Sequence, residues 1–117
     1  MRRAHKQQTT RAKAELHDVL MPLVHAMYEE FKEFGKKKPD AGVAKSKIEV
    51  VNRLLDRCRA VLKSEASLQF LDLLDEDDVP ENSDVILMLS QYVAAMEQFK
   101  QNHYGWDGTE STWFTKD

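Results

Sequence analysis

ELHDVLMPLVHAMYEEFKEF, residues 15–34, is the stretch that decides the fold, because its apolar residues recur every three or four positions. This spacing places them on one face of an α-helix. We predict a helix over residues 10–34 that ends at Gly35, since glycine is favoured just after a helix. The apolar face contains Leu16, Leu20, Leu23, Met27 and Phe34, and Val19, Val24 and Phe31 widen it.

Pro22 lies inside this predicted helix. A proline removes one backbone hydrogen bond and clashes with the carbonyl four residues earlier, which is that of Asp18. The apolar pattern nevertheless keeps its phase on both sides of the proline. We therefore predict one helix with a kink at Pro22, and not two separate helices.

Two more helices are predicted in the middle of the chain. A polar loop, KKKPDAG (residues 36–42), precedes a helix over residues 43–63. Ser64 and Ser67 are candidate caps for a short helix over roughly residues 66–75. The inward-facing side chains of the short helix are predicted to be Leu68, Leu71 and Leu74.

A last long helix follows an acidic loop, DEDDVPENSD (residues 75–84). Asn82 or Ser83 is predicted to cap its first turn, and the helix is expected to end near Tyr104. No β-type alternation of useful length is present. The fold class is therefore all-α, an up-and-down helical bundle of three long helices plus one short helix. Residues 1–9 are predicted to be a flexible basic arm, residues 10–105 the bundle domain, and residues 106–117 an aromatic tail.

The amino-acid composition indicates which cellular compartment to expect and argues against disulfides, cysteine-based zinc sites and membrane spans. Cys58 is the single cysteine, so neither an internal disulfide nor a cysteine-based zinc site is expected. No apolar run approaches the length of a membrane span. We expect a cytoplasmic protein of 117 residues that makes no membrane contact.

The motifs of metal sites and enzymes are weak. Asp75 and Asp77 are spaced like the first two ligands of an EF-hand calcium loop, but Pro80 stands at the position where that loop needs glycine. His25 and Glu29 are helical neighbours that favour a surface role over a metal site. Cys58 lies on an apolar helix face, which predicts a buried thiol. Arg57 and Arg59 beside it would lower the pKa of an exposed thiol, so a reactive cysteine stays an alternative. We predict no enzyme activity, no metal and no cofactor.

Charge is divided unequally along the chain. Residues 1–63 contain 15 of the 17 lysines and arginines, and residues 64–117 contain 12 of the 20 acidic residues. This asymmetry suggests a charged partner. The candidate binding residues for an anion or a partner are Lys36, Lys37, Lys38, Lys45, Lys47, Arg53 and Arg57. They would attract a phosphate or an acidic peptide, or else the acidic stretch of residues 72–84, within one chain or across a dimer.

The tail supplies the candidate interface residues Trp106, Trp113 and Phe114. Folding back onto the bundle is the simplest interpretation, because such side chains are seldom left in solvent. They are also suited to anchoring the tail in a partner's groove or to exchange between two protomers. These three alternatives stay open on the sequence alone.

Together these features predict a non-enzymatic helical protein–protein interaction module that self-associates as a homodimer or binds another protein. The alternative is a nucleic-acid-associated protein that uses the basic N-terminal half. Its phosphate contacts would come from the lysine cluster and from Arg2, Arg3, Lys6, Arg11 and Lys13. An acidic second half and a sequence pI near 5.8 favour the interaction module.

Overall fold

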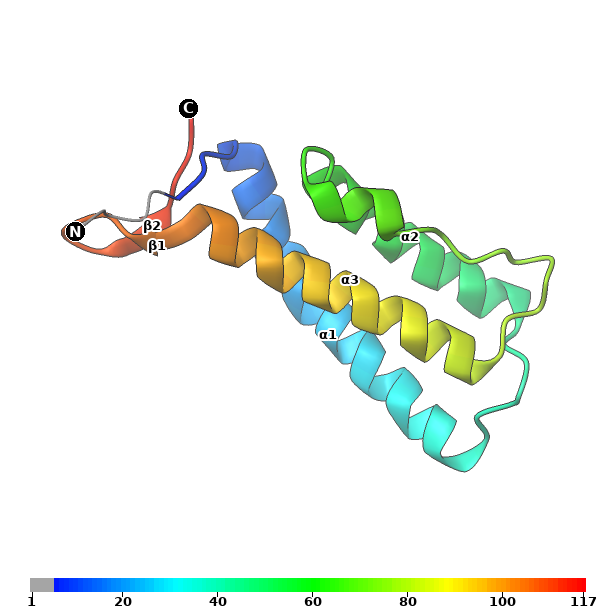
Figure 1. Ribbon diagram of the computed structural model, residues 1–117. Helices are drawn as coiled ribbons and strands as arrows, with labels where there is room; N and C mark the ends of the chain where they lie inside the picture. Colours follow the sequence, from blue (N-terminus) through cyan, green and yellow to red (C-terminus); the bar gives the residue numbers. More distant parts are fainter. Residues whose placement is uncertain (1–5) are drawn as a thin grey trace.

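The computed structural model describes residues 6–117. It contains the helices α1 (Arg11–Lys37), α2 (Lys45–Val61) and α3 (Asn82–His103), the 3-10 helix η1 (Ala66–Phe70), and the strands β1 (Tyr104–Trp106) and β2 (Ser111–Trp113). The three long helices pack into an elongated bundle with extents of 52 × 23 × 22 Å (Figure 1). The described part of the chain is therefore mostly helical, with a small two-stranded sheet at one end.

Helix α1 is one continuous helix through Pro22, which confirms the prediction of a single element. It begins after Thr10, whose side chain accepts a hydrogen bond from the backbone of Lys13 at 3.2 Å. The predicted end at Gly35 is wrong, because the helix continues to Lys37. It ends just before Pro39, as expected from the steric restriction that proline places on the preceding residue.

Gly35 has a packing role inside α1. A Cβ atom at this position would collide with the side chain of Ile86 on α3. Any larger residue here would require the end of the Ile86 side chain to shift, so glycine lets α1 and α3 pack without that adjustment.

Helix α3 begins at Asn82, slightly earlier than the predicted caps imply, and its cap differs from the prediction. Glu81 occupies the N-cap position in place of Asn82 or Ser83. The backbone N–H of Glu81 donates to Oδ2 of Asp84 at 2.9 Å. This is one half of a capping box, and Asp84 also lies at the end of the helix where the macrodipole favours negative charge.

The predicted short fourth helix is not an α-helix. Residues 66–70 form the 3-10 helix η1, and the chain then continues without regular structure to the start of α3. Leu71 and Leu74 are buried as predicted, although they lie in extended chain. We call residues 71–79 the strap; Figure 1 shows it on the α2 side of the bundle. The bundle thus has three helices and a strap in place of four helices.

The tail forms β structure that the sequence did not predict. Strands β1 and β2 pair antiparallel, with Tyr104 opposite Trp113 and Trp106 opposite Ser111. In the turn, Oδ1 of Asp107 accepts hydrogen bonds from the backbone of Thr109 and Glu110, and these bonds lower the pKa of the Asp107 carboxyl. The hairpin extends from the C-terminal end of α3 (Figure 1).

Part of the predicted flexible arm is tied to α3 and to the tail. The N–H of Gln7 donates to the carbonyl of Asn102 at 3.0 Å, and that of Thr9 donates to Phe114 at 2.9 Å. Thr9 is buried and forms a parallel bridge with Thr115. Residues 6–9 are therefore held in place, whereas residues 1–5 of the predicted arm lie outside the described residues.

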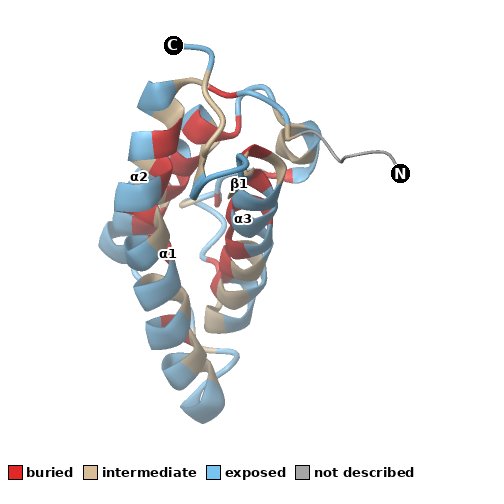
Figure 2. Cartoon of the chain, turned by 90° about the vertical axis from the view of Figure 1, so that its left-hand side faces the viewer, coloured by how far each residue is buried: buried red, intermediate tan, exposed pale blue. Residues whose placement is uncertain are grey.

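The core lies along the axis of the bundle, between the three helices. Figure 2 shows the buried residues on the sides of α1, α2 and α3 that face one another. Helices α2 and α3 bury one periodic apolar face each, with α3 contributing the largest share, whereas α1 buries Leu20, Val24 and Phe31 but leaves other predicted core positions exposed. The fully buried side chains include Val24, Ile48, Leu55, Leu62, Leu89, Tyr92, Met96 and Phe99.

Candidate functional site: the α1/α2 groove

Three helices that pack side by side create three seams, and the strap seals the seam between α2 and α3. Asn52 on α2 makes two hydrogen bonds to the backbone of Leu74, of 2.8 and 2.9 Å. Arg59 donates to the carbonyl of Leu71, and the hydroxyl of Tyr92 on α3 donates to that of Asp72 at 2.8 Å. Side chains of both helices thus bond to the strap backbone at Leu71, Asp72 and Leu74.

The tail covers part of the seam between α1 and α3. Trp113 packs edge-on against His17 of α1, with ring centroids 5.1 Å apart, and lies 5.8 Å from the ring of Phe99 on α3. Its indole Nε1 donates to Oδ2 of Asp18 at 3.1 Å. This side chain therefore joins the bundle of its own chain, as the simplest interpretation of the tail predicted.

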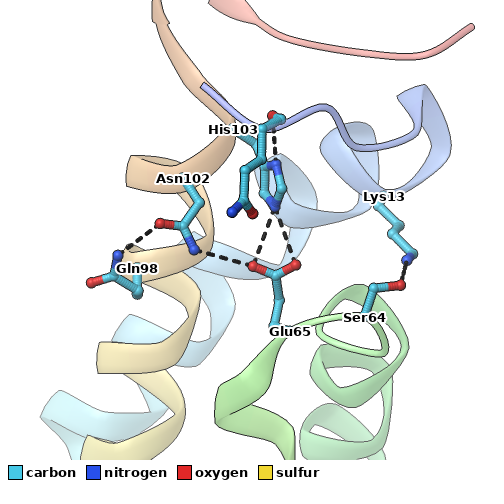
Figure 3. A network of polar contacts seen from close by, with 7 residues as sticks. Lys13, Ser64, Glu65, Gln98, Asn102 and His103 are labelled. Atoms are coloured by element: carbon cyan, nitrogen blue, oxygen red, sulfur yellow. Dashed lines mark hydrogen bonds and ion pairs between the residues drawn. The ribbon is translucent and has the colours of Figure 1, made fainter. Parts of the chain in front are cut away.

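A polar network closes the same end of the bundle (Figure 3). The buried His103 lies with Nε2 3.2 Å from the carboxylate of Glu65 and with Nδ1 2.8 Å from the carbonyl of Gln7. Asn102 also donates to Glu65, at 3.3 Å. These contacts hold the end of α3 against η1 and the N-terminal segment, so a structural role accounts for every polar atom that they involve.

The seam between α1 and α2 is hollowed along its length. Three adjoining depressions share lining residues with one another, and the middle one shares Met27, Glu30 and Val50 with one neighbour. Two of the apolar side chains here are largely open to solvent: Leu23 is 53% exposed and Val50 is 48% exposed. We call this surface the α1/α2 groove. Its lining residues are Leu20, Leu23, Ala26, Met27, Glu30, Phe31, Phe34, Lys37, Lys38, Gly42, Val43, Ala44, Ser46, Lys47, Val50, Val51, Arg53, Leu54, Arg57 and Asn82.

Five of the seven predicted basic residues line this groove. Lys37, Lys38 and Lys47 lie at the end nearest the α1–α2 loop, and Arg53 and Arg57 lie along the α2 edge. All five are exposed, and none forms an ion pair with another residue in the range 6–117. The structure thus brings the predicted basic cluster and an exposed apolar surface together.

The other two predicted basic residues have acidic neighbours in the chain. Lys36 pairs with Glu33 at 2.9 Å, and Lys45 lies 3.7 Å from Asp77 in the acidic loop. The predicted return of the acidic stretch to the lysines within one chain therefore occurs, but only at Lys45 among the described residues. The groove itself keeps a positive character, because Glu30 is the only carboxylate among its described lining residues.

The predicted interface residues of the tail do not act together. Trp113 packs against the core, and Phe114 is half-buried with its backbone paired to Thr9 and His103. Trp106 is 64% exposed on the hairpin. None of the three lines the groove, so the tail and the basic cluster are separate features of the surface.

The weaker candidate chemistries have structural explanations. His25 lies 3.4 Å from Glu97 on α3, and Glu29 pairs instead with Lys32 at 3.0 Å. Cys58 is fully buried, and burial raises the pKa of its thiol to about 12, so it carries no thiolate near neutral pH. Among residues 6–117 no group of three or more histidine, cysteine or acidic side chains is placed to hold a metal ion.

Sequence reasoning missed the groove because it assigned all of the α1 stripe to the core. Leu23, Val19 and Phe34 were predicted to face inward, yet each is exposed. The missed signal was the width of the stripe: α1 carries more apolar residues than one packed face needs. Of these excess residues, Leu23 and Phe34 line the groove.

In comparisons with known proteins, no family model, no curated protein and no solved structure matches the chain. Within residues 6–117, no helix combines the length and the apolar character that a membrane crossing requires.

Proposed function

We propose that the chain is a non-enzymatic helical protein–protein interaction module and that the α1/α2 groove is its docking surface. One observation carries the proposal: an exposed apolar row lies beside five cations that have no ion-pair partner among the described residues. Clustered apolar surface on a folded domain marks interaction sites more often than scattered apolar residues do. The strap covers the α2/α3 seam and the tail covers part of the α1/α3 seam, whereas no segment among residues 6–117 lies over the α1/α2 groove.

Site-specific photo-crosslinking in cells tests the proposal. A photoreactive amino acid at Val50, in the middle of the groove, is expected to give discrete covalent adducts with a protein that mass spectrometry then identifies. The matched control is Leu87 on α3, which is 61% exposed but lies outside the groove. Adducts at Val50 should disappear when Leu23→Asp is added, because the charge makes the apolar floor unfavourable for burial.

Adducts of equal yield at Val50 and Leu87, or none at Val50, would contradict the groove as a docking surface. A crosslink at Val50 to nucleic acid would favour the alternative function. The structure gives that alternative less support, because its basic residues lie near opposite ends of α1, a helix of 27 residues. Lys6 and Lys13 also bond within the chain, to the carbonyl of Gln101 and to the hydroxyl of Ser64.

A homodimer is the second candidate, because the acidic loop of one copy offers charges opposite to the groove cations of another. Light scattering after size-exclusion chromatography tests it, at about 50 mM and about 500 mM salt. A mass near twice 13.6 kDa at low salt that falls to 13.6 kDa at high salt is the result expected for charge-driven pairing. A mass of 13.6 kDa at both salt concentrations would leave a different protein as the partner.

A further inference from the structure

We infer that the occupant of the α1/α2 groove is an amphipathic helix of another protein whose polar edge is acidic. This inference rests on the proposed docking function and adds the chemistry of the partner. The shape and the hydrogen-bonding capacity of the groove favour a helix, and its charge favours an acidic one.

The shape of the groove matches a helix. Its apolar lining extends along α1 from Leu20 to Phe34, which corresponds to about 20 Å or four helical turns. On α2 it is bordered by Val50 and Leu54. Two packed helices with a depression between them accept a third helix through its i, i+3, i+4 and i+7 side chains. A docked helix would cover the exposed side of α1 and convert the bundle from three helices to four.

The hydrogen-bonding capacity of the groove favours a helix over an extended peptide. The strap shows what extended chain requires in this protein, namely Asn52, Arg59 and Tyr92 bonding to its backbone. In the groove the floor is apolar and the edge residues Arg53 and Arg57 only donate, so Glu30, Ser46 and Asn82 are the side-chain acceptors among its described lining residues. Three acceptors are too few for the N–H groups of an extended peptide along the groove, whereas a helix satisfies its own backbone.

The charge of the groove selects an acidic partner. Arg53 and Arg57 are one helical turn apart on the same edge, and Lys47 lies farther along it, over the ring of Phe34 at 5.2 Å. Glutamates spaced by one turn on a docked helix would face both arginines. If a second copy docked with its groove against this one, the lysines and arginines of the two grooves would face and repel one another. The acidic loop of a second copy has the complementary charge, but residues 71–81 form no helix that could lie in the groove. The exposed side of α3 has Leu87 as its large exposed apolar residue and offers no apolar stripe.

The test uses the full chain and two synthetic peptides of about 18 residues. Both peptides carry leucines at helical i, i+3, i+4 and i+7 positions; one has glutamates along the edges of this stripe and the other has lysines. Binding is measured by fluorescence anisotropy of the labelled peptide. We expect the glutamate peptide to bind more tightly, and its circular dichroism to show helix formation on binding.

A charge swap makes the test specific. Arg53→Glu with Arg57→Glu should weaken binding of the glutamate peptide by about tenfold, because it replaces two exposed ion pairs with repulsion between like charges. The same double variant should strengthen binding of the lysine peptide. The matched control, Lys63→Glu with Lys116→Glu, reverses two exposed lysines outside the groove and should change neither affinity.

The outcomes separate this inference from the proposed function. Equal affinity of the two peptides, or binding without helix formation, would overturn the acidic helix while leaving the groove as a docking surface. Binding that survives Leu23→Asp would place the peptide elsewhere and overturn the inference as well. If Val50 crosslinks to a protein but neither peptide binds, the inference fails and the docking function stands. If Val50 gives no specific adduct, the docking function itself fails.

Discussion

Trp113→Ala is expected to lower the free energy of unfolding by about 3 kcal/mol. The indole ring packs among His17, Phe99 and Tyr104, and its removal leaves a cavity at the point where the tail meets α1 and α3. The substitution also deletes the hydrogen bond from Nε1 to Asp18. Urea denaturation followed by far-ultraviolet circular dichroism measures the loss.

The other tryptophan of the tail provides the control. Trp106 lies on the same hairpin but is 64% exposed, so Trp106→Ala should change the free energy of unfolding by less than about 0.5 kcal/mol. Similar losses for the two variants would mean that the hairpin is not docked through Trp113. A loss that appears only with Trp113→Ala would support the tail as a structural part of this bundle.

The second large effect is expected at Asn52, where Asn52→Ala should destabilise the fold by about 2–3 kcal/mol. Its side chain both donates to and accepts from the backbone of Leu74, and removal leaves two peptide groups without partners beneath the strap. The same urea titration gives the magnitude. Hydrogen exchange at the amide of Leu74 should accelerate more than exchange in the middle of α3.

Gln98→Ala is the matched control for Asn52→Ala. It removes an exposed side-chain hydrogen bond, 2.9 Å long, between Gln98 and Asn102. Because both groups can bond to water, this variant should lose less than about 0.5 kcal/mol. If Asn52→Ala were as mild, the strap would not depend on its backbone contacts with α2.

The long helices could be predicted because their information is local. The recurrence of Leu20, Val24 and Phe31 along α1, and of Leu89, Met96 and Phe99 along α3, follows the helical repeat and needs no knowledge of the rest of the chain. The end of α1 was predicted less well, since Gly35 signals a stop in isolation. Its close contact with Ile86 is a tertiary requirement that the pattern does not contain.

The strap and the hairpin could not be predicted for the same physical reason. Strands β1 and β2 have three residues each, too few to establish an alternating pattern. Leu71 and Leu74 have helical spacing, but they are buried in extended chain because Asn52, Arg59 and Tyr92 bond to the strap backbone. Partners this distant in the sequence override local propensity.

The candidate site was predicted in part. The sequence identified its cations, because lysines beside a helix start break a local preference. It did not identify the apolar floor, because periodicity gives the width of a stripe but not what covers it. Leu23 was predicted to face the core, and Val50 was not assigned to any face. Only the packing of α1 against α2 and α3 shows that nothing in the described chain covers them.

The pairing of Gln7 and Thr9 with Asn102 and Phe114 makes the described chain nearly a closed ring in space. Contacts such as that of His103 with Gln7, 96 residues apart, restrict the chain entropy far more than a helical turn does. They rest on hydrogen bonds and on Trp113, so we expect this end of the molecule to open at a lower free energy than the bundle core. Such an opening would expose His17 and Phe99, which Trp113 covers, to water without disturbing the α1/α2 groove, whose lining includes neither residue.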